Sequence, residues 1–397
     1  MKYDFETTPN RKGTGSMKWD QMYGWNPEVD EGVIPLSVAD MELKNAPEIY
    51  EGLIDYLKTE PVLGYVGATD AYYQAVIDWQ KRRHNWQIEQ DWIVTTPGVI
   101  AAFYAAVRAF SKKDDGVIIF RPVYYPFGSA IEDNRRTEVN VPLIEEDGDG
   151  KIDFEGFEEA ASKPENKILI FCSPHNPVGR VWTEDELKRI ADIANKHDIF
   201  VVSDEIWYDL LSPGVEHTVI AKVDEELQKR LIVCTAASKS FSLAGMHTSN
   251  IIIPNEAVRE KFVTELERSR QNMVGIMGFE ATRLAYEKAE DWLDQVNDLV
   301  YQNQLMVKKF FEDNYPKITA PISEGTYLQW LDFRALGMSN EELEEFLHKD
   351  AQFFTDEGYI FGEEGSGCER TNVACPRKDL QELLDRLLVA LKEREEA

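Results

Sequence analysis

Residues 234–245 read Cys-Thr-Ala-Ala-Ser-Lys-Ser-Phe-Ser-Leu-Ala-Gly, and they follow the apolar run Leu-Ile-Val at 231–233. The apolar run predicts a buried strand, and the small residues after it predict a loop that holds Lys239 where this strand ends. In α/β proteins the carboxyl ends of the strands carry the chemistry. Desolvation lowers the pKa of a lysine, and the neutral amine can form a Schiff base with an aldehyde. Because most Ser-Lys pairs lie in surface loops, Lys239 has to be weighed together with the rest of the chain.

Short apolar runs alternate with helical patterns on both sides of this stretch. Further strands are expected near 92–95, 117–120, 137–141, 168–171, 200–203 and 249–253, and helices near 46–58, 70–83, 99–111, 154–162 and 183–197. Such strands, rich in Val and Ile, predict a mostly parallel sheet of about seven strands that is flanked by helices. We therefore expect an α/β fold with a large domain at 46–285.

The remaining parts of the chain have a different pattern. One long helix is expected over 280–311, and it suits a bridge between two domains. Beyond it the pattern predicts strands near 326–331 and 372–374 and helices near 340–348 and 379–393. We expect a smaller α+β domain at 286–397, to which the N-terminal arm at 1–45 contributes.

The composition excludes several classes of function. The chain has 397 residues and a net charge of −29, so it lacks the basic surface that nucleic-acid phosphates require. No apolar run approaches the roughly 20 residues that span a membrane, and residues 1–10 are too polar for a secretory signal. Four cysteines without C-x-x-C spacing, and no clustered histidines, predict neither a disulfide framework nor a metal site. We expect reduced thiols and a cytoplasmic location.

Three more segments place glycine or polar residues directly after predicted strands. Residues 97–100, Pro-Gly-Val-Ile, open a helix whose free N–H groups and dipole can hold a phosphate, although an ordinary turn would look the same. Asn176 precedes a proline, which holds it extended with its amide aimed past the strand end; a plain turn is the alternative. Asp204 ends another strand, where it could cap a helix or hold a pyridine nitrogen protonated.

These features occur in a fixed order along the chain: the glycine turn, the aromatic Tyr124, Asn176, Asp204 and Lys239. Each of them follows a predicted strand of one sheet. Because the carboxyl ends of parallel strands meet at one edge, these side chains can converge on one crevice.

In this order of motifs the chain resembles the fold-type-I pyridoxal-phosphate enzymes, the aspartate aminotransferase superfamily, over nearly its whole length. Within that superfamily it is similar to the cystathionine β-lyase (MalY/PatB-like) branch. The resemblance rests on Lys-Trp-Asp at 18–20, Val-Ala-Asp-Met at 38–41, Pro-His-Asn-Pro-Val-Gly-Arg-Val-Trp at 174–182, Ser-Asp-Glu-Ile at 203–206, Ser-Lys-Ser-Phe-Ser-Leu-Ala-Gly at 238–245, Glu-Gly-Thr-Tyr-Leu at 324–328 and Arg-Thr-Asn-Val-Ala-Cys-Pro-Arg at 370–377. It implies pyridoxal 5′-phosphate as the cofactor.

The resemblance also implies a role for each residue that lines the crevice. Lys239 forms the Schiff base with the cofactor and, once displaced by the substrate, removes the proton from Cα. Asp204 pairs with the pyridinium nitrogen, Asn176 hydrogen-bonds the 3′ oxygen of the ring, and Tyr124 stacks on the ring. Lys239, Tyr124 and Asp204 are thus the expected catalytic residues. Arg370 is similar to the arginine that clamps the substrate α-carboxylate, a bidentate task suited to guanidinium.

On the same resemblance the phosphate of the cofactor is held from two sides. The N–H groups of Val99 and Ile100 cradle it, with Ser238 nearby. Tyr65 matches a tyrosine that reaches the phosphate of the neighbouring subunit, which implies a homodimer with shared sites. The N-terminal arm is expected to build part of the pocket wall.

Two positions depart from the wider superfamily. Three residues after Asp204 a Tyr or His is usual near the 3′ oxygen, whereas this chain has Trp207, whose indole can donate a hydrogen bond but cannot accept one. The neighbouring Tyr208 is expected to point elsewhere. Eight residues after Lys239, His247 stands where many aminotransferases have a phosphate-binding arginine. It either belongs to the cofactor shell or is a hydrogen-bonded core residue, and it weakens the case for an ordinary aminotransferase.

These residues imply a pyridoxal-phosphate-dependent C–S β-lyase that cleaves L-cystathionine or related cysteine S-conjugates to a thiol, pyruvate and ammonia. The alternative is an aminotransferase of class I/II, which would use the same residues on another L-amino acid. A regulatory cofactor-binding domain is a third possibility, but such domains accompany a DNA-binding module, and this chain is strongly acidic.

Overall fold

Short strands rich in Val, Ile and Leu form the central sheet. The structure is a computed structural model that describes residues 3–60, 62–146 and 149–396. Within these residues the sheet has seven strands in the order β1-β9-β8-β7-β6-β2-β3. Their bounds are β1 (Ile93–Thr96), β2 (Gly116–Ile119), β3 (Thr137–Asn140), β6 (Asn166–Cys172), β7 (Phe200–Asp204), β8 (Leu231–Thr235) and β9 (Ser249–Ile252). Only β9 runs antiparallel to its neighbours, so the predicted mostly parallel α/β sheet is confirmed.

The central strands are buried on both faces because helices cover the sheet, with α4 packed across several of its strands. The helices are α1 (Met17–Trp25), α2 (Pro47–Thr59), α3 (Asp70–His84), α4 (Val99–Phe110), α5 (Pro126–Glu132), α6 (Phe154–Ser162), α7 (Glu184–His197), α8 (Ala237–Ser240), α9 (Glu256–Ser269), α10 (Ile276–Lys288), α11 (Glu290–Asn314), α12 (Asn340–Glu345) and α13 (Arg377–Glu396). The capping box of Thr183 and Glu186 fixes the start of α7, where the helix near 183–197 is expected. Within the described ranges no helix is both long and apolar enough to cross a membrane.

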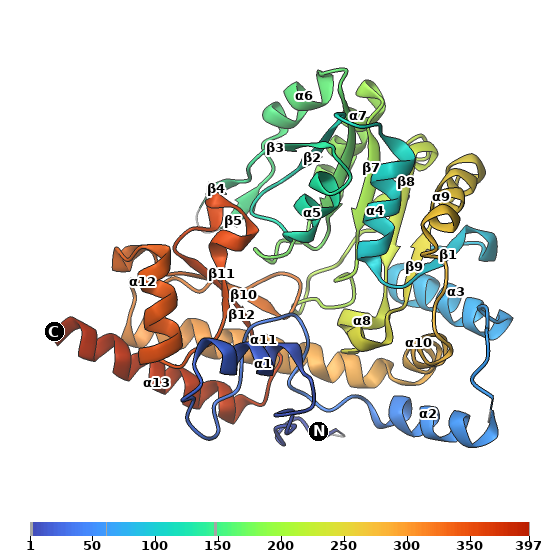
Figure 1. The fold of residues 1–397 in the computed structure, drawn as a ribbon. Coiled ribbons are helices and arrows are strands. Elements are labelled where there is room, and N and C mark those ends of the chain that lie inside the picture. The colour runs from blue at the N-terminus through green and yellow to red at the C-terminus, as the bar shows by residue number, and fades with distance from the viewer. Residues whose placement is uncertain (1–2, 61, 147–148, 397) are drawn as a thin grey trace.

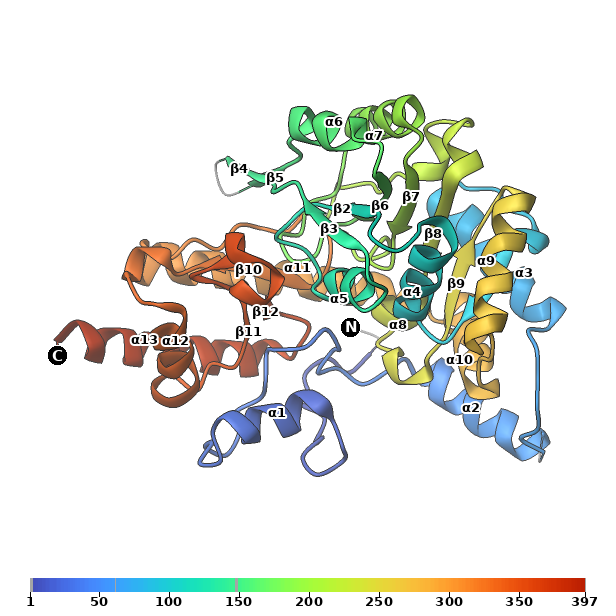
Figure 2. The same cartoon turned by 45° about the horizontal axis from the view of Figure 1, so that its top comes forward.

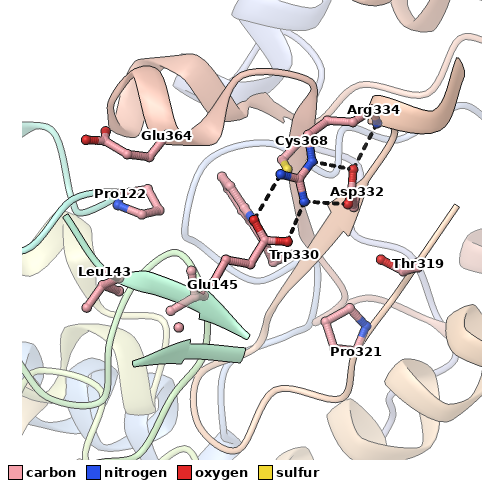
Figure 3. A pocket seen from close by; sticks show the side chains of 12 residues that line it. Pro122, Leu143, Glu145, Thr319, Pro321, Trp330, Asp332, Arg334, Glu364 and Cys368 are labelled. Atoms are coloured by element: carbon pink, nitrogen blue, oxygen red, sulfur yellow. Dashed lines mark hydrogen bonds and ion pairs between the residues drawn. The ribbon is translucent and has the colours of Figure 1, made fainter. Parts of the chain in front are cut away.

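A second, antiparallel sheet lies to one side of the central sheet. Within the described residues it has three strands in the order β10 (Leu328–Asp332), β12 (Cys368–Asn372) and β11 (Asp356–Glu357). Figures 1 and 2 show it beside α12 and α13, whereas α2, α3, α9 and α10 lie at the opposite side of the central sheet. The small hairpin of β4 (Ile144–Glu146) and β5 (Asp149–Lys151) reaches from the large sheet toward β10, where Arg334 bonds to Glu145 (Figure 3).

The long helix α11 connects the two sheets. The amide of Asn297 donates to the carbonyl of Asp209 at 2.9 Å, on the side of the large sheet. The amide of Asn303 donates to the carbonyls of Val373 and Cys375 at 2.8 and 2.9 Å, next to the small sheet. The bridging role is therefore seen, while the domain boundaries at 45 and 285 stay predictions.

Three local predictions are wrong. The helix expected over 280–311 is two helices that meet at Ala289, because Ala289 has φ of −112° and ψ of 15° and so leaves the helical conformation that propensity alone would continue. The strand expected at 372–374 is β12, which lies earlier and is polar, so it lacks the alternation of a half-buried strand. Lys239 lies in the one-turn helix α8 rather than in a loop.

Candidate active site

A cavity of about 710 Å³ lies between the carboxyl edge of the central sheet and the small sheet. Its walls include seven of the residues singled out in the sequence, namely Val99, Tyr124, Asn176, Asp204, Trp207, Lys239 and Arg370. The ends of three strands are level here, because Asp204 pairs in register with Cys172 on one side and Cys234 on the other. The predicted convergence on one crevice is thus seen for these seven residues.

The amine of Lys239 is enclosed where β8 gives way to α8. Its Nζ donates to the carbonyl of Ala39 at 2.8 Å and lies 5.5 Å from the centre of the Trp207 ring. Burial, together with the nearby cation of Arg370, lowers the pKa of Lys239 from 10.5 to about 8. Near neutral pH a far larger share of this amine is therefore unprotonated than in an exposed lysine, which is the state that a nucleophile or a base requires.

The Ala39 carbonyl is held in place by residues that are distant in sequence. The hydroxyl of Tyr327 donates to the same oxygen at 2.8 Å. The amide of Asn372 donates to the carbonyls of Val38 and Asp40, the residues on either side, at 2.8 and 2.7 Å. Val38 has φ of 51°, a left-handed conformation that is unfavourable for a β-branched residue. The hydrogen bonds around it therefore fix a strained turn that aims one carbonyl at the amine.

A buried ion network anchors the N-terminal arm to this turn. Lys18 is 1% exposed, and its Nζ lies 3.3 Å from a carboxylate oxygen of Glu42 and 3.5 Å from one of Asp40. Arg11 pairs with the same two carboxylates at 2.7 and 2.9 Å. Two of the motifs that carry the resemblance, 18–20 and 38–41, thus meet in space and shape the wall next to the amine.

The carboxylate of Asp204 is buried without a charged partner. It accepts one hydrogen bond, from the N–H of Ile206 at 3.3 Å, and no cationic side chain forms an ion pair with it in the described part of the chain. Burial raises the pKa of Asp204 to about 7. A buried acid at the floor of a cavity, lacking a cation of its own, fits a ligand that presents a protonated ring nitrogen.

Arg370 is held on the opposite wall by two side chains. Its Nε and Nη2 donate to one oxygen of Asp356 at 3.2 and 2.6 Å, and its Nη1 donates to the Oδ1 of Asn176 at 2.9 Å. The guanidinium also lies over the ring of Phe361. Three of its five N–H donors are thereby used, so two are left for a carboxylate in the cavity.

The start of α4 provides a site for an anion. Gly98 has φ of 100° and leads directly into the helix, and nothing lies within 4 Å of the position where a Cβ would stand. The N–H groups of Val99 and Ile100 occupy the first turn, where a helix leaves its N–H groups without backbone partners. A phosphate can approach these groups only where the glycine leaves room.

Aromatic side chains cover the cavity from two sides. Tyr124 lines it, and the backbone N–H of Tyr124 donates to the carbonyl of Asn176 at 3.1 Å. Trp207 is 2% exposed and packs edge-on against Tyr327, with 4.8 Å between the ring centres. Tyr208 points away, as expected: it stacks on His84 behind the sheet edge and does not line the cavity.

Four of the predicted residues do not line the cavity of this chain, namely Ile100, Ser238, His247 and Tyr65. The side chain of Ile100 faces outward from α4, and Ser238 is half-buried next to the reactive lysine. His247 is exposed, so the alternative of a hydrogen-bonded core histidine is wrong. Tyr65 is 94% exposed. The parts assigned to these four in holding a phosphate stay predictions.

The comparisons with known proteins agree with this geometry. The family model described as aminotransferase class I and II matches residues 31–387. The chain belongs to the class I and II aminotransferase family. Within the family it is 34% identical to cystathionine β-lyase PatB of Bacillus subtilis, over 98% of this chain and all of that protein. It is 32% identical to protein MalY of Escherichia coli, over 98% of this chain and 99% of that protein.

Among solved structures, cystalysin from Treponema denticola, which contains a pyridoxal 5′-phosphate cofactor, superposes with a TM-score of 0.97. It is 51% identical to this chain, and the match covers 99% of this chain and all of that one. The predicted fold type I and the PatB/MalY-like branch are confirmed by these family members.

Several residues of the site were not named as site residues from the sequence. Ala39 lines the cavity, and Tyr327 does not line it but donates to the Ala39 carbonyl. Both lie in quoted motifs, 38–41 and 324–328, although no chemical argument singled them out. Asp356, the partner of Arg370, lies in no quoted motif, and its two-residue strand is too short for a period to show. The N-terminal arm does contribute to the wall, as predicted, through Met17 and Gln21 of α1.

Proposed function

We propose that this chain is a pyridoxal-phosphate-dependent C–S β-lyase that cleaves L-cystathionine or related cysteine S-conjugates to a thiol, pyruvate and ammonia. The observation that carries the proposal is the enclosed amine of Lys239, which shares one cavity with an unpaired buried acid and a buried arginine. The 34% identity to PatB, over 98% of this chain, favours the lyase over other reactions of the family.

The walls of the cavity fit the proposed cofactor. Asp204 would hold the proton on the ring nitrogen, Tyr124 would cover one face of the ring, and Asn176 would donate to the ring oxygen. The N–H groups of Val99 and Ile100 would hold the phosphate. When bound, pyridoxal phosphate supplies an aldehyde that condenses with amines and a ring that accepts an electron pair from the neighbouring carbon.

The residues of this chain supply the proton transfer and the orientation. Arg370 would fix the α-carboxylate of the amino acid, so that its Cα faces Lys239. The neutral amine of Lys239 then takes the Cα proton. Loss of the thiolate from Cβ leaves a three-carbon fragment, which water converts to pyruvate and ammonia. Trp207 beside the amine can donate a hydrogen bond but takes up no proton.

An aminotransferase is the second candidate, because the family model that matches carries that description and the same wall residues serve both reactions. The two differ in the fate of the substrate. A lyase releases pyruvate from L-cystathionine alone, whereas an aminotransferase turns over only when a keto acid is present to take up the amino group. The cytoplasmic location that the reduced cysteines favour stays a prediction.

Replacing Arg370 with lysine should raise KM for the amino acid about 10- to 100-fold while the cofactor stays bound. A lysine can reach either Asp356 or the substrate but cannot pair with both, since it lacks the planar fork of guanidinium. Steady-state kinetics and the cofactor content of the purified variant measure the two effects.

The matched control is Arg334→Lys. Arg334 also lies in the small-sheet region, where it pairs with Glu145 and Asp332 outside the active-site cavity (Figure 3). The Arg334→Lys variant should leave KM unchanged. An unaltered KM in the Arg370 variant would show that another group binds the carboxylate.

We further propose a homodimer in which Tyr65 reaches the phosphate of the neighbouring active site. Apolar side chains are exposed together on α2 and the segment after it, where a solvated surface would be polar: Tyr50, Ile54, Leu57, Val62, Leu63, Tyr65 and Val66. Tyr65 itself makes no contact with its own cavity.

Tyr65→Phe should lower the affinity for pyridoxal phosphate about 10-fold or more, because a hydrogen bond to a charged phosphate is lost while the apolar ring remains. Cofactor titration of the apoprotein measures this affinity, and light scattering measures the mass of the particle. Tyr50→Phe on the same surface is the control and should bind the cofactor normally. A monomer with full cofactor affinity would contradict the shared site.

A further inference from the structure

Next to the active-site cavity, a cluster of polar side chains lies between the small sheet and α12. The two residues of β11 face opposite sides, as neighbours in a strand do. Asp356 bonds to Arg370, and Glu357, which also lines the cavity, lies 3.6 Å from His348. The cluster therefore adjoins the cavity, one residue along the strand from the group that holds the proposed carboxylate-binding arginine.

Glu344, His348 and Glu357 converge in this cluster. One ligand atom from each lies within 4.8 Å of the other two. Glu344 lies in the last turn of α12, and His348 follows four residues later in a π-helical turn, Phe346–Asp350, so both face the same side of the helix. Glu357 approaches from the strand opposite.

His348 is buried, and no residue that the structure describes forms a hydrogen bond with its ring. It is 6% exposed, and its Nε2 is 3.6 Å from the Glu357 carboxylate, beyond hydrogen-bond distance. The ring plane is fixed by stacking on Trp25, with 4.3 Å between centres, and on Phe354 at 5.5 Å. A nitrogen of an immobilised imidazole is thus directed at two carboxylates without bonding to either.

Among the described residues, no lysine or arginine forms an ion pair with Glu344, Glu357 or the neighbouring Glu369. Glu369 lies directly opposite Glu357 in the ladder of β11 and β12, and like charges at such positions repel. Glu369 is buried and bonds only to the hydroxyl of Thr355 among the described residues.

We propose that Glu344, His348 and Glu357 form a binding site for a divalent transition-metal ion of the Zn²⁺ type. An imidazole nitrogen with two carboxylate oxygens is a donor set that suits Zn²⁺ and disfavours Mg²⁺ and Ca²⁺, which take oxygen alone. Bonds of roughly 2.1 Å would bring the three atoms to about 3.4 Å from one another. Glu344, which is only half-buried, can make this movement.

A neighbouring group already orients one of the ligands. The hydroxyl of Tyr359 donates to Glu344 at 3.1 Å, as outer groups commonly do for carboxylates that bind metals. The ion would neutralise the facing glutamates and fix β11, the strand that carries Asp356.

The test measures Zn²⁺ bound to the cofactor-loaded protein after treatment with a chelator. After incubation with Zn²⁺ and gel filtration, elemental analysis should find about one ion per chain in the wild type. Zn²⁺ should also raise the midpoint of thermal unfolding by about 3 °C, because it binds the folded state. Glu344→Gln and His348→Gln should lose both the retained ion and the shift.

Glu341→Gln, an exposed position one turn earlier on α12, is the matched control and should retain the ion. His348 is buried, so the half-buried Glu344 provides the variant whose fold is least disturbed. Equal retention of Zn²⁺ by the wild type and Glu344→Gln would overturn the proposal. A wild type that retains no Zn²⁺ would also overturn the proposal.

Discussion

Lys239→Ala should lower the rate of pyruvate formation from L-cystathionine by about 10⁴-fold or more. The substitution removes both the amine that attaches the cofactor and the base that takes the Cα proton, and each of these contributions is large. The rest of the cavity should persist, because the Lys239 side chain bonds only to the Ala39 carbonyl among the described residues. The variant should still fold and bind pyridoxal phosphate without a covalent link.

Reduction with borohydride followed by peptide mass measurement distinguishes the attached cofactor from a bound one. In the wild type the peptide that contains Lys239 should carry the cofactor mass, and in the variant no peptide should. Lys81→Ala, at an exposed position of α3, is the control and should behave as the wild type. Cofactor mass on a different lysine of the wild type would place the attachment point elsewhere.

Asp204→Asn should lower kcat about 10²- to 10³-fold, because a neutral amide cannot stabilise the protonated ring nitrogen on which electron withdrawal depends. The same change should stabilise the cofactor-free protein at pH 8. Burial raises the pKa of Asp204 to about 7, so the folded state binds its proton more tightly than the unfolded chain, in which the group titrates near 3.8.

The pH dependence of the unfolding free energy follows from this difference in pKa between the folded and unfolded states. Between about pH 4 and pH 7 the unfolding free energy of the cofactor-free wild type should fall as the pH rises, since the folded state has to give up a proton that the unfolded state has already lost. Asparagine does not ionise, so the variant should lack this fall and be more stable above pH 7 by about 2–4 kcal/mol. Urea unfolding of both proteins at pH 5 and pH 8 measures this difference in unfolding free energy.

Asp192→Asn, at an exposed position of α7, is the control and should change neither kcat nor the pH dependence. Bound cofactor should cancel the stabilising effect of Asp204→Asn, because the ring nitrogen then compensates the carboxylate. A variant that is active, or that is no more stable than the wild type at pH 8, would remove Asp204 from the role of the buried acid.

Much of the architecture could be predicted because strand and helix patterns are strong where burial is uniform. The central strands are apolar on both faces, and the start of α7 carries a complete capping box, so both were visible in the sequence. In the small sheet, β10 was expected in nearly its observed place, whereas β12 was misplaced because it is buried but polar. Its Glu369 and Arg370 are held by Thr355 and Asp356, partners that no local pattern reveals.

The site was predictable to the extent that its residues follow strands. Asp204 and Lys239 end neighbouring strands, so topology alone brings them to one edge. The turn at Val38 depends instead on Asn372, more than 300 residues away in the chain, and such contacts have no signature in one dimension. Only the motif around Ala39 indicated that this turn matters.

Three segments of the chain thus meet at the amine of Lys239: the N-terminal arm through Ala39, the large sheet through Asp204, and the small sheet through Arg370. The buried ion pairs of Lys18 anchor the N-terminal arm, and Asp356 anchors Arg370. A change in either anchor should therefore alter the position of the reacting groups, and the metal site proposed next to Asp356 would act in this way.

Release of pyruvate from L-cystathionine tests the central claim most directly. The purified protein, loaded with pyridoxal phosphate and supplied with L-cystathionine but no keto acid, should form pyruvate, a free thiol and ammonia in equal amounts. The Lys239→Ala protein, prepared in parallel, should form none above background. Turnover that appears only after a keto acid is added, with formation of a new amino acid in place of pyruvate, would contradict the lyase and establish the aminotransferase.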